Sequence, residues 1–212
     1  MICASIAEKD VARCIEALDK VEVAEIRIDL GEFSNEEIRK VFSRRKKTIA
    51  TCRPGKIRDE ERVEMLKIAI ASGATYVDIE FEAGQDYKND LIDFAHKHQC
   101  DVIISYHNYD RTPELDELEE IVRQCYAQGA DLAKIATHVN VNRDNSKILS
   151  LYKAPGRLVA IGMGDLGRIS RIVAPFLGAE FTYASLSDGE ATAPGQINYD
   201  RLNKFILEIQ EI

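Results

Sequence analysis

One pattern recurs along the chain: an amphipathic stretch, then Gly-Ala, then a short apolar run typical of a strand. It occurs as SGATYVDIE, QGADLAKIA and LGAEFTYAS. The glycines Gly73, Gly129 and Gly178 stand where a helix ends, a position that favours left-handed backbone, which glycine adopts easily because it has no Cβ atom. They lie 56 and 49 residues apart. Each interval holds about two strand–helix units of roughly 25 residues.

Eight such units of about 26 residues would account for all 212 residues, which is close to the smallest workable (β/α)8 barrel. Strict strand–helix alternation with short connections favours one α/β domain over residues 1–212, a TIM barrel. The alternative, an open doubly wound sheet, is disfavoured because no glycine-rich phosphate loop follows an early strand. The expected strands lie near residues 2–6, 22–29, 48–53, 75–81, 101–106, 131–136, 157–162 and 180–184.

Helix start signals fall between the expected strands. Ser34 and Glu37 form a capping-box pattern, with the serine as N-cap and the glutamate three residues later. Thr112 before Pro113 predicts the N-cap and first residue of a later helix.

Composition and charge limit the partners. A formal charge of −8 argues against nucleic acid or an anionic membrane, because both require a basic patch, but it is compatible with a small anionic substrate. No apolar run approaches the roughly 20 residues of a membrane span, and the first residues lack a signal-peptide pattern. Five scattered cysteines without a CxxC pair argue against disulfides or zinc and indicate a reducing compartment. We therefore expect a cytoplasmic protein.

Polar side chains share one face in several expected strands. Strands of a parallel sheet covered by helices are normally apolar throughout. Most of the exceptions stand in the second half of a strand, which in a barrel belongs to the active-site end. A solvated strand end would explain any one of them, whereas five strands together predict one polar pocket. The sets are Glu25, Arg27 and Asp29; Thr51 and Arg53; Asp78 and Glu80; Ser105 and His107; and Lys134 alone.

Lys134 lies in the middle of the apolar run DLAKIAT. Burial disfavours the ammonium form, so we expect the pKa of Lys134 to fall and a free amine to become available. A desolvated lysine near other cations, here Arg27, Arg53 and Arg171, is typical of a Schiff-base nucleophile. The alternative is a lysine that extends from a strand end into water.

His107, at the end of the strand before Lys134, is the expected acid/base partner because its pKa is near working pH. His138 follows Lys134 by four residues and is the competing candidate. His96 and His98 lie on an expected helix and are predicted to be surface residues.

Two late segments offer further binding groups. GMGDLGRISRIV predicts a glycine-rich strand-to-helix turn that favours an anion, and either Arg168 or Arg171 could hold a carboxylate. In the loop TAPGQI, Thr192 and Gln196 offer hydrogen bonds, unless the segment is a plain turn.

Taken in order, these motifs resemble the type I 3-dehydroquinate dehydratase family. They follow the family's order and cover essentially the whole chain. The matching segments are Glu25-Ile-Arg27-Ile-Asp29-Leu30, Arg53, Ser105-Tyr-His107, Gly129-Ala-Asp-Leu-Ala-Lys134, Gly162-Met-Gly with Ile169-Ser-Arg171, and Ala193-Pro-Gly-Gln196.

The resemblance implies a hydro-lyase that converts 3-dehydroquinate to 3-dehydroshikimate, a step toward aromatic amino acids, without metal or cofactor. Lys134 would form the Schiff base with the ketone, His107 would move protons and Arg171 would hold the carboxylate. The family often dimerises, which implies a homodimer. The other implied substrate-binding residues are Ser5, Glu25, Arg27, Arg53, Thr192 and Gln196.

The chain departs from the family at two points. Thr192 replaces a serine and preserves the hydroxyl. The family also has a glutamate about four residues after the strand-3 arginine, which orients the catalytic histidine; here Ile57 stands there. Glu60 or Glu61 would fill this role if the loop is longer, and the sequence does not choose between them.

Two other functions compete with the dehydratase. A class I aldolase on the same barrel would use the same lysine but needs a phosphate-binding loop, and the last loops show no clear one. A catalytically inactive barrel kept as a binding module is disfavoured because Lys134, His107 and Arg171 are all present.

Overall fold

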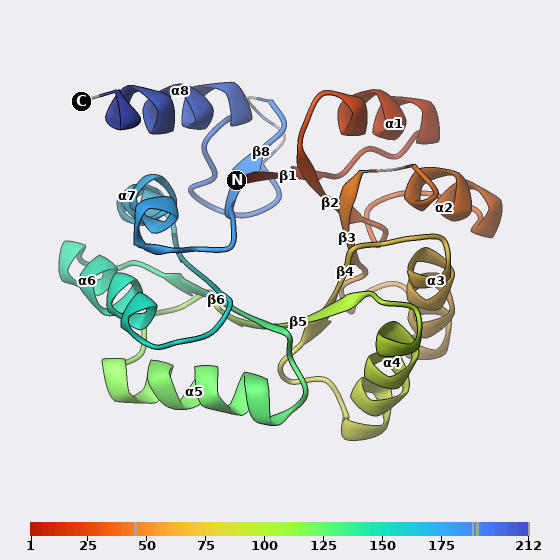
Figure 1. Ribbon diagram of the computed structural model, residues 1–212, viewed down its shortest axis with the longest axis horizontal. Coiled ribbons are helices and arrows are strands. Elements are labelled where there is room, and N and C mark those ends of the chain that lie inside the picture. Colours follow the sequence, from red (N-terminus) through yellow and green to blue (C-terminus); the bar gives the residue numbers. More distant parts are fainter. Residues whose placement is uncertain (45, 188, 190, 212) are drawn as a thin grey trace.

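The computed structural model describes residues 1–44, 46–187, 189 and 191–211. Over these residues, eight strands alternate with eight α-helices (Figure 1). The strands are β1 (Ile2–Ile6), β2 (Val23–Arg27), β3 (Lys47–Thr51), β4 (Tyr76–Glu80), β5 (Asp101–Asn108), β6 (Leu132–His138), β7 (Leu158–Met163) and β8 (Thr182–Ser185). The helices are α1 (Val11–Asp19), α2 (Asn35–Phe42), α3 (Asp59–Ala71), α4 (Gln85–Lys97), α5 (Leu115–Ala127), α6 (Asn142–Ser150), α7 (Arg168–Val173) and α8 (Tyr199–Gln210).

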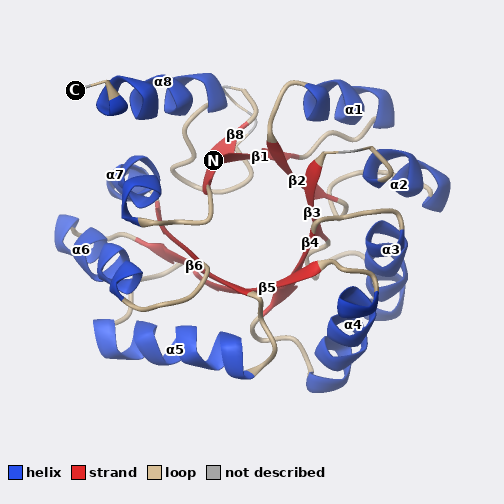
Figure 2. Cartoon of the chain, viewed as in Figure 1, coloured by secondary structure: helices blue, strands red, loops and turns tan. Residues whose placement is uncertain are grey.

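The strands form one parallel sheet in the order β7-β6-β5-β4-β3-β2-β1-β8. Figure 2 shows them as a ring of strands inside a ring of helices. β7 and β8 stand at the two ends of this order, and just before β8 the N–H of Glu180 donates to the carbonyl of Leu158 over 3.1 Å. The predicted (β/α)8 barrel is confirmed.

Each strand lies where the sequence predicts one, with ends shifted by a few residues. β2 ends at Arg27, so Asp29 falls in the turn that follows rather than within the strand. Its carboxylate nevertheless stays on the same side, because Arg27 donates to both Asp29 oxygens over 2.7 and 3.0 Å.

The recurring glycines adopt the predicted left-handed backbone. Their φ angles are 108° at Gly73, 100° at Gly129 and 96° at Gly178. Gly73 and Gly129 follow the ends of α3 and α5, whereas Gly178 ends a 3-10 helix, η3 (Ala174–Leu177). In each case the glycine lets the chain leave a helix and turn into the next strand.

One of the two predicted helix starts is correct. Ser34 and Glu37 form the complete capping box of α2. The prediction for Thr112 is wrong, because α5 begins later, with Glu114 as N-cap. The Thr112 hydroxyl instead forms hydrogen bonds with β6. It donates to the carbonyl of His138 over 2.8 Å and lies 3.0 Å from the Thr137 hydroxyl.

The interior of the barrel has an apolar lower part and a polar upper part. Near the N-terminal ends of the strands, inward-facing side chains such as Ile49, Ile103, Leu132 and Phe181 form a buried cluster. On β1 to β6, the next inward position along the strand holds a polar residue. The hydrophobic effect thus fills the base of the barrel and keeps water from reaching the polar layer from beneath.

All five cysteines are buried and unpaired. Within the described part of the chain, no helix combines the length and apolar character needed to cross a membrane.

Candidate active site

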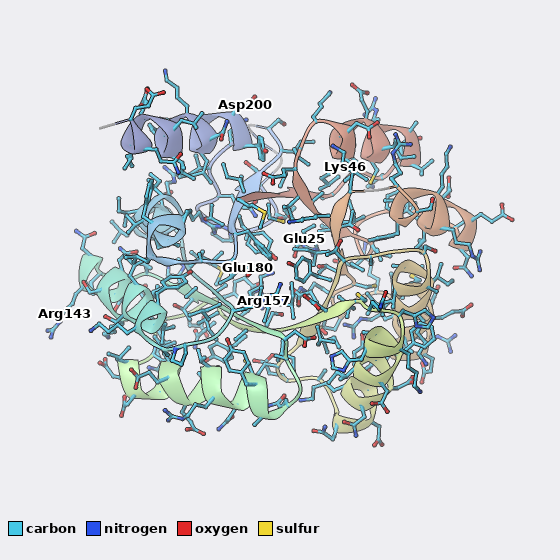
Figure 3. All side chains as sticks on the ribbon, viewed as in Figure 1. Glu25, Lys46, Arg143, Arg157, Glu180 and Asp200 are labelled. Atoms are coloured by element: carbon cyan, nitrogen blue, oxygen red, sulfur yellow. The ribbon has the colours of Figure 1, made fainter. Side chains whose placement is uncertain are left out.

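A pocket opens at the carboxyl ends of the strands. Of the nine residues for which the sequence predicts a catalytic or binding role, eight line it directly, and Ser5 lies behind Glu25. Figure 3 shows Glu25 in the interior of the barrel. The lining residues are Glu25, Arg27, Arg53, His107, Tyr109, Lys134, Ala136, Ile161, Met163, Arg171, Tyr183, Thr192, Ala193 and Gln196.

Lys134 lies at the floor of this pocket and is only 4% exposed. Its Nζ atom is 2.9 Å from Oδ2 of Asp78 and 3.3 Å from Oε1 of Glu25. The burial was expected from the sequence, but the two carboxylates beside the amine were not. They neutralise the charge of a buried ammonium that would otherwise be costly to desolvate.

Asp78 connects the amine to the rest of the pocket. Its Oδ2 accepts hydrogen bonds from Lys134 and Arg53, both over 2.9 Å, and its Oδ1 accepts one from Ser105 over 2.6 Å. Burial by itself raises the pKa of Asp78, but the positive charges of Arg53 and Lys134 outweigh burial and hold the pKa far below its usual range. Sequence alternation placed Asp78 on the correct face without assigning it a role, so its importance was missed.

Glu25 binds the same amine from the opposite strand. Ser5 donates to one carboxylate oxygen over 2.6 Å, and Thr51 donates to the other over 3.1 Å. Burial raises the pKa of Glu25, but the positive charges of Lys134, Arg53 and Arg27 together outweigh burial, so the pKa lies below its ordinary value. Glu25 therefore remains an acceptor for the Lys134 N–H groups.

Arg53 is held by a second carboxylate and, through it, by a helix. Its Nη1 donates to Oε1 of Glu80 over 3.1 Å. The other oxygen of Glu80 accepts from Arg62 of α3 over 2.7 Å, and Arg62 also donates to the carbonyl of Cys52 over 2.8 Å. Arg62 was missed, because a charge in the pattern of a helix is normally on its solvent face.

Arg171 is fully buried and has few partners. One Nη1 hydrogen bond reaches the Tyr183 carbonyl over 3.3 Å, and its Nε and Nη2 atoms have no partner among the described residues. Burial lowers the pKa of Arg171 to about 10. Arg168, the alternative, is half exposed and pairs with Asp165 over 2.7 Å, so only Arg171 faces the pocket with free donors.

His107 lines the pocket on the strand next to Lys134. Burial, together with the positive charges of Arg53 and Lys134, lowers the pKa of His107 well below 6.5, against a smaller opposing effect of Asp78. The ring stacks on Tyr109, with centroids 6.1 Å apart and planes 13° apart. The imidazole is therefore neutral and available as a proton acceptor.

The other histidines lie elsewhere. His138 packs against Gly164, where a Cβ atom would come within 2.8 Å of its Cε1 atom, and it is not among the lining residues. His96, on α4, and His98, its C-cap residue, are both exposed, as predicted.

Neither Glu60 nor Glu61 reaches His107. Both are exposed in the first turn of α3, and Glu60 lines an outer groove with Arg39 and Phe94 rather than the barrel mouth. The loop after β3 is short, so α3 starts before either side chain could turn inward. The carboxylate whose charge acts on His107 is Asp78.

Residues 192–196, which follow β8, lie at the edge of the pocket and are held there by several contacts. Gly195 has a φ of 77°, and a Cβ atom there would collide with the Gly164 carbonyl, so this position requires glycine. Gly164 donates its N–H to Pro194 over 3.2 Å. Thr192 donates its N–H to Gln196 over 2.8 Å and its hydroxyl to Ser5 over 2.8 Å. Thr192 thus joins the loop to the Glu25 cluster.

The pocket suits an anion although the protein is acidic. Four cations, Arg27, Arg53, Lys134 and Arg171, line it with a single carboxylate, Glu25. Among the residues that the structure describes, His, Cys, Asp and Glu side chains form no cluster placed to hold a metal ion. Local cations that converge in a concave site raise the local concentration of an anionic substrate.

Comparisons with known proteins agree with this geometry. The family model described as type I 3-dehydroquinase matches residues 2–212. The chain belongs to this family. It is 37% identical to the 3-dehydroquinate dehydratase of Methanococcus maripaludis strain C5 over 228 aligned positions, which cover all of both chains. It is 35% identical to the protein of the same name from Methanocaldococcus jannaschii over 218 positions, with 96% of each chain covered.

Solved structures show the same fold. The 3-dehydroquinate dehydratase of Aquifex aeolicus superposes with a TM-score of 0.86 at 26% identity and covers all of both chains. The type I enzyme of Clostridium difficile gives a TM-score of 0.87 at 23% identity, covering 99% of this chain and 92% of the other. 3-Hexulose-6-phosphate synthase superposes with a TM-score of only 0.64 at 16% identity and shares the fold alone. Family membership favours the dehydratase over the aldolase.

Proposed function

We propose that this chain dehydrates 3-dehydroquinate to 3-dehydroshikimate through a Schiff base on Lys134. The observation that carries the proposal is a buried lysine amine at the floor of a cationic pocket, 2.9 Å from Asp78 and 3.3 Å from Glu25. Family membership supports the substrate, and the pocket supports the chemistry.

Substrate binding depends on groups around the rim. The Nε and Nη2 atoms of Arg171 are free to form a two-point contact with the substrate carboxylate. Arg53, Arg27 and Gln196 face the space above Lys134 and would hold the ring hydroxyls. These contacts would place the ketone carbon against the Lys134 amine.

The reaction then proceeds through a protonated imine and an enamine. His107 takes one proton from the Lys134 ammonium, and the free amine attacks the ketone carbon. His107 then returns this proton to the hydroxyl of the adduct, which leaves as water and gives a protonated imine. Its positive nitrogen acidifies the adjacent C–H, from which the neutral His107 removes a proton to give an enamine. His107 then returns this proton to the leaving hydroxyl, which departs as water. Hydrolysis of the new imine releases the product and restores Lys134.

Borohydride trapping tests the covalent step. Reduction in the presence of 3-dehydroquinate, followed by peptide mass spectrometry, should find one adduct, on Lys134. Lys134→Ala should show none, whereas Lys88→Met, a change at another buried lysine that lies outside the pocket on α4, should leave the adduct intact. An active preparation with unmodified Lys134 would disprove the mechanism.

The same assay separates the two histidines. His107→Ala should still form the adduct but lose turnover by roughly 10²–10⁴-fold, the usual contribution of a general acid/base. His138→Ala should stay near the parent rate. The reverse pattern would move the role to His138.

We also propose a cytoplasmic homodimer that acts as a single catalytic domain and binds neither nucleic acid nor membranes. The dimer rests on the family resemblance, the cytoplasm on five unpaired cysteines, and the lack of polyanion binding on the formal charge of −8. Sedimentation equilibrium at several protein concentrations tests the dimer, and a purely monomeric species would refute it.

A further inference from the structure

The aromatic ring of Tyr183 lies directly against the amine of Lys134. Tyr183 stands on β8 and points into the barrel, and the Lys134 Nζ atom is 4.3 Å from its ring centroid. The two residues are 2% and 4% exposed. The face of an aromatic ring carries negative potential and attracts a cation, more strongly where water is excluded.

The ring is held in place from below. Phe181 contacts it edge to face, with centroids 5.5 Å apart and planes 71° apart, and Tyr76 contacts Phe181 in the same manner at 5.8 Å. The Tyr183 carbonyl accepts a hydrogen bond from Arg171. Such packing leaves the ring face in position before any substrate arrives.

The carboxylates alone cannot stabilise the Lys134 nitrogen equally well at every step. An ammonium has three N–H donors and can bind Asp78 and Glu25 together, as it does here. A protonated imine keeps one N–H, so it can donate fully to only one of them. A ring face needs no N–H donor, because it acts on the charge itself.

We propose that Tyr183 is a further catalytic residue, whose ring face stabilises the positive charge on the Lys134 nitrogen when the protonated imine forms. This role rests on the proposed Schiff base. It places the ring of Tyr183 beside the reacting nitrogen, in addition to the two hydrogen-bonding carboxylates.

The hydroxyl of Tyr183, unlike its ring, takes no part in the proposed role. It is buried and has no partner among the described residues. Burial and the nearby charge of Glu25 raise the pKa of Tyr183 well above its ordinary value, so the phenol stays neutral. The ring, rather than the hydroxyl, is therefore the active part.

Fluorinated phenylalanines test this role with little change in size. Tyr183 is replaced by phenylalanine and by its mono-, di- and trifluorinated forms, because each fluorine weakens the attraction of the ring for a cation. The measurements are the rate of borohydride-trappable adduct formation on Lys134 and kcat. Tyr183→Phe should stay within about twofold of the parent, and the fluorinated series should fall stepwise by roughly 2- to 30-fold in total, the range of a partly to fully desolvated cation–π contact.

The same series at Phe181 is the matched control, because that ring touches Tyr183 and not the amine. Fluorination of Phe181 should change neither the rate of adduct formation nor kcat. Thermal unfolding should show that every variant is folded. A flat series at Tyr183 with normal adduct formation would overturn the ring's role alone, and so would a Tyr183→Phe variant as slow as the trifluorinated one. A parent enzyme without any Lys134 adduct would overturn the proposed function, and this role with it.

Discussion

At the scale of single residues, the buried cations of the pocket differ in how their charge is balanced. Lys134 and Arg53 share the carboxylate of Asp78, whereas within the described part of the chain the one hydrogen-bond partner of the Arg171 side chain is the Tyr183 carbonyl. A buried charge without a counterion destabilises a fold. The proposed contact with the substrate carboxylate would explain the position of Arg171, whereas stability does not.

Arg171→Met should separate these two properties. We expect KM to rise by roughly 10²- to 10⁴-fold, because the two proposed charge-assisted hydrogen bonds to the substrate are lost at about 1.5–3 kcal/mol each. The free energy of unfolding should stay equal or rise by about 1–3 kcal/mol, since the uncompensated charge is removed. Steady-state kinetics and urea unfolding measure the two effects. Arg168→Met, which alters an exposed arginine paired with Asp165, should change neither. Loss of stability in Arg171→Met would show that the charge is compensated.

The lowered pKa of His107 predicts how stability depends on pH. Below the ordinary histidine pKa of about 6.5, the unfolded chain binds a proton at His107 that the folded protein does not bind. Stability therefore declines as pH falls through this value, by up to about 1.4 kcal/mol per pH unit from this group. His107→Ala should flatten that decline in urea unfolding between pH 7 and 5, and His98→Ala, on the exposed surface, should not. An unchanged slope in His107→Ala would place its pKa near the ordinary value.

At the scale of elements, the outer helices shape the site as well as cover the sheet. α3 begins directly after the short β3 loop, which brings Arg62 beneath the end of β4. There it shares Glu80 with Arg53. The helix thereby takes part in orienting an arginine of the pocket, although it contributes no lining residue.

Arg62→Met tests this contribution of α3. Removing one partner of a buried ion pair should lower the free energy of unfolding by about 3 kcal/mol, and KM should rise because Glu80 then draws Arg53 away from the substrate. Arg62→Met combined with Glu80→Gln should cost less stability than the two single changes added together. Asp59→Asn removes only the exposed partner of Arg62 and should cost at most about 1 kcal/mol. Additive losses in the double variant would exclude the coupling.

At the scale of the whole molecule, the barrel closes where β8 meets β7, the two ends of the strand order. Arg157, just before β7, donates to both oxygens of Glu180, just before β8, over 2.9 and 3.2 Å. Arg157 also reaches Asp101 over 2.6 Å and the Tyr76 hydroxyl over 2.9 Å. Arg157 and Glu180 lie near each other in Figure 3. This network links the starts of β7 and β8, at the end of the barrel opposite the pocket.

Glu180→Gln should weaken the closure without affecting turnover. Hydrogen bonding to Arg157 holds the pKa of Glu180 below its ordinary value, so its contribution to stability is present above about pH 4.3 and is lost as pH falls below that. Because Arg157 is 40% exposed, water screens the pair, and we expect a loss of roughly 1 kcal/mol at pH 7. Thermal unfolding should show this loss at pH 7 and a smaller difference at pH 3. Glu208→Gln, in an exposed pair on α8, is the control. An equal loss at both pH values would mean that packing, not charge, is involved.

Local signals in the sequence were enough to predict the fold and the membership of the pocket. The period of two in EIRIDL placed Glu25 on an inward face, a lone charge inside the apolar run DLAKIAT singled out Lys134, and Gly73, Gly129 and Gly178 marked the ends of helices. The alternation and the glycine positions depend only on local backbone geometry, and the lone lysine on the composition of a few neighbouring residues. The resemblance to the family then assigned a role to each of the polar residues at the strand ends.

Only the tertiary structure decided which of these residues meet. Lys134 pairs with partners 56 and 109 positions away, and its choice of Asp78 and Glu25 depends on how the strands are staggered around the barrel. The structure also decided that Arg171, and not Arg168, faces the pocket, because the two lie one turn apart on a short helix and only Arg171 is buried. By itself, the sequence determined that a buried lysine and several cations share one end of a barrel. The partners of each charge depend on distances across the barrel, which no local pattern encodes.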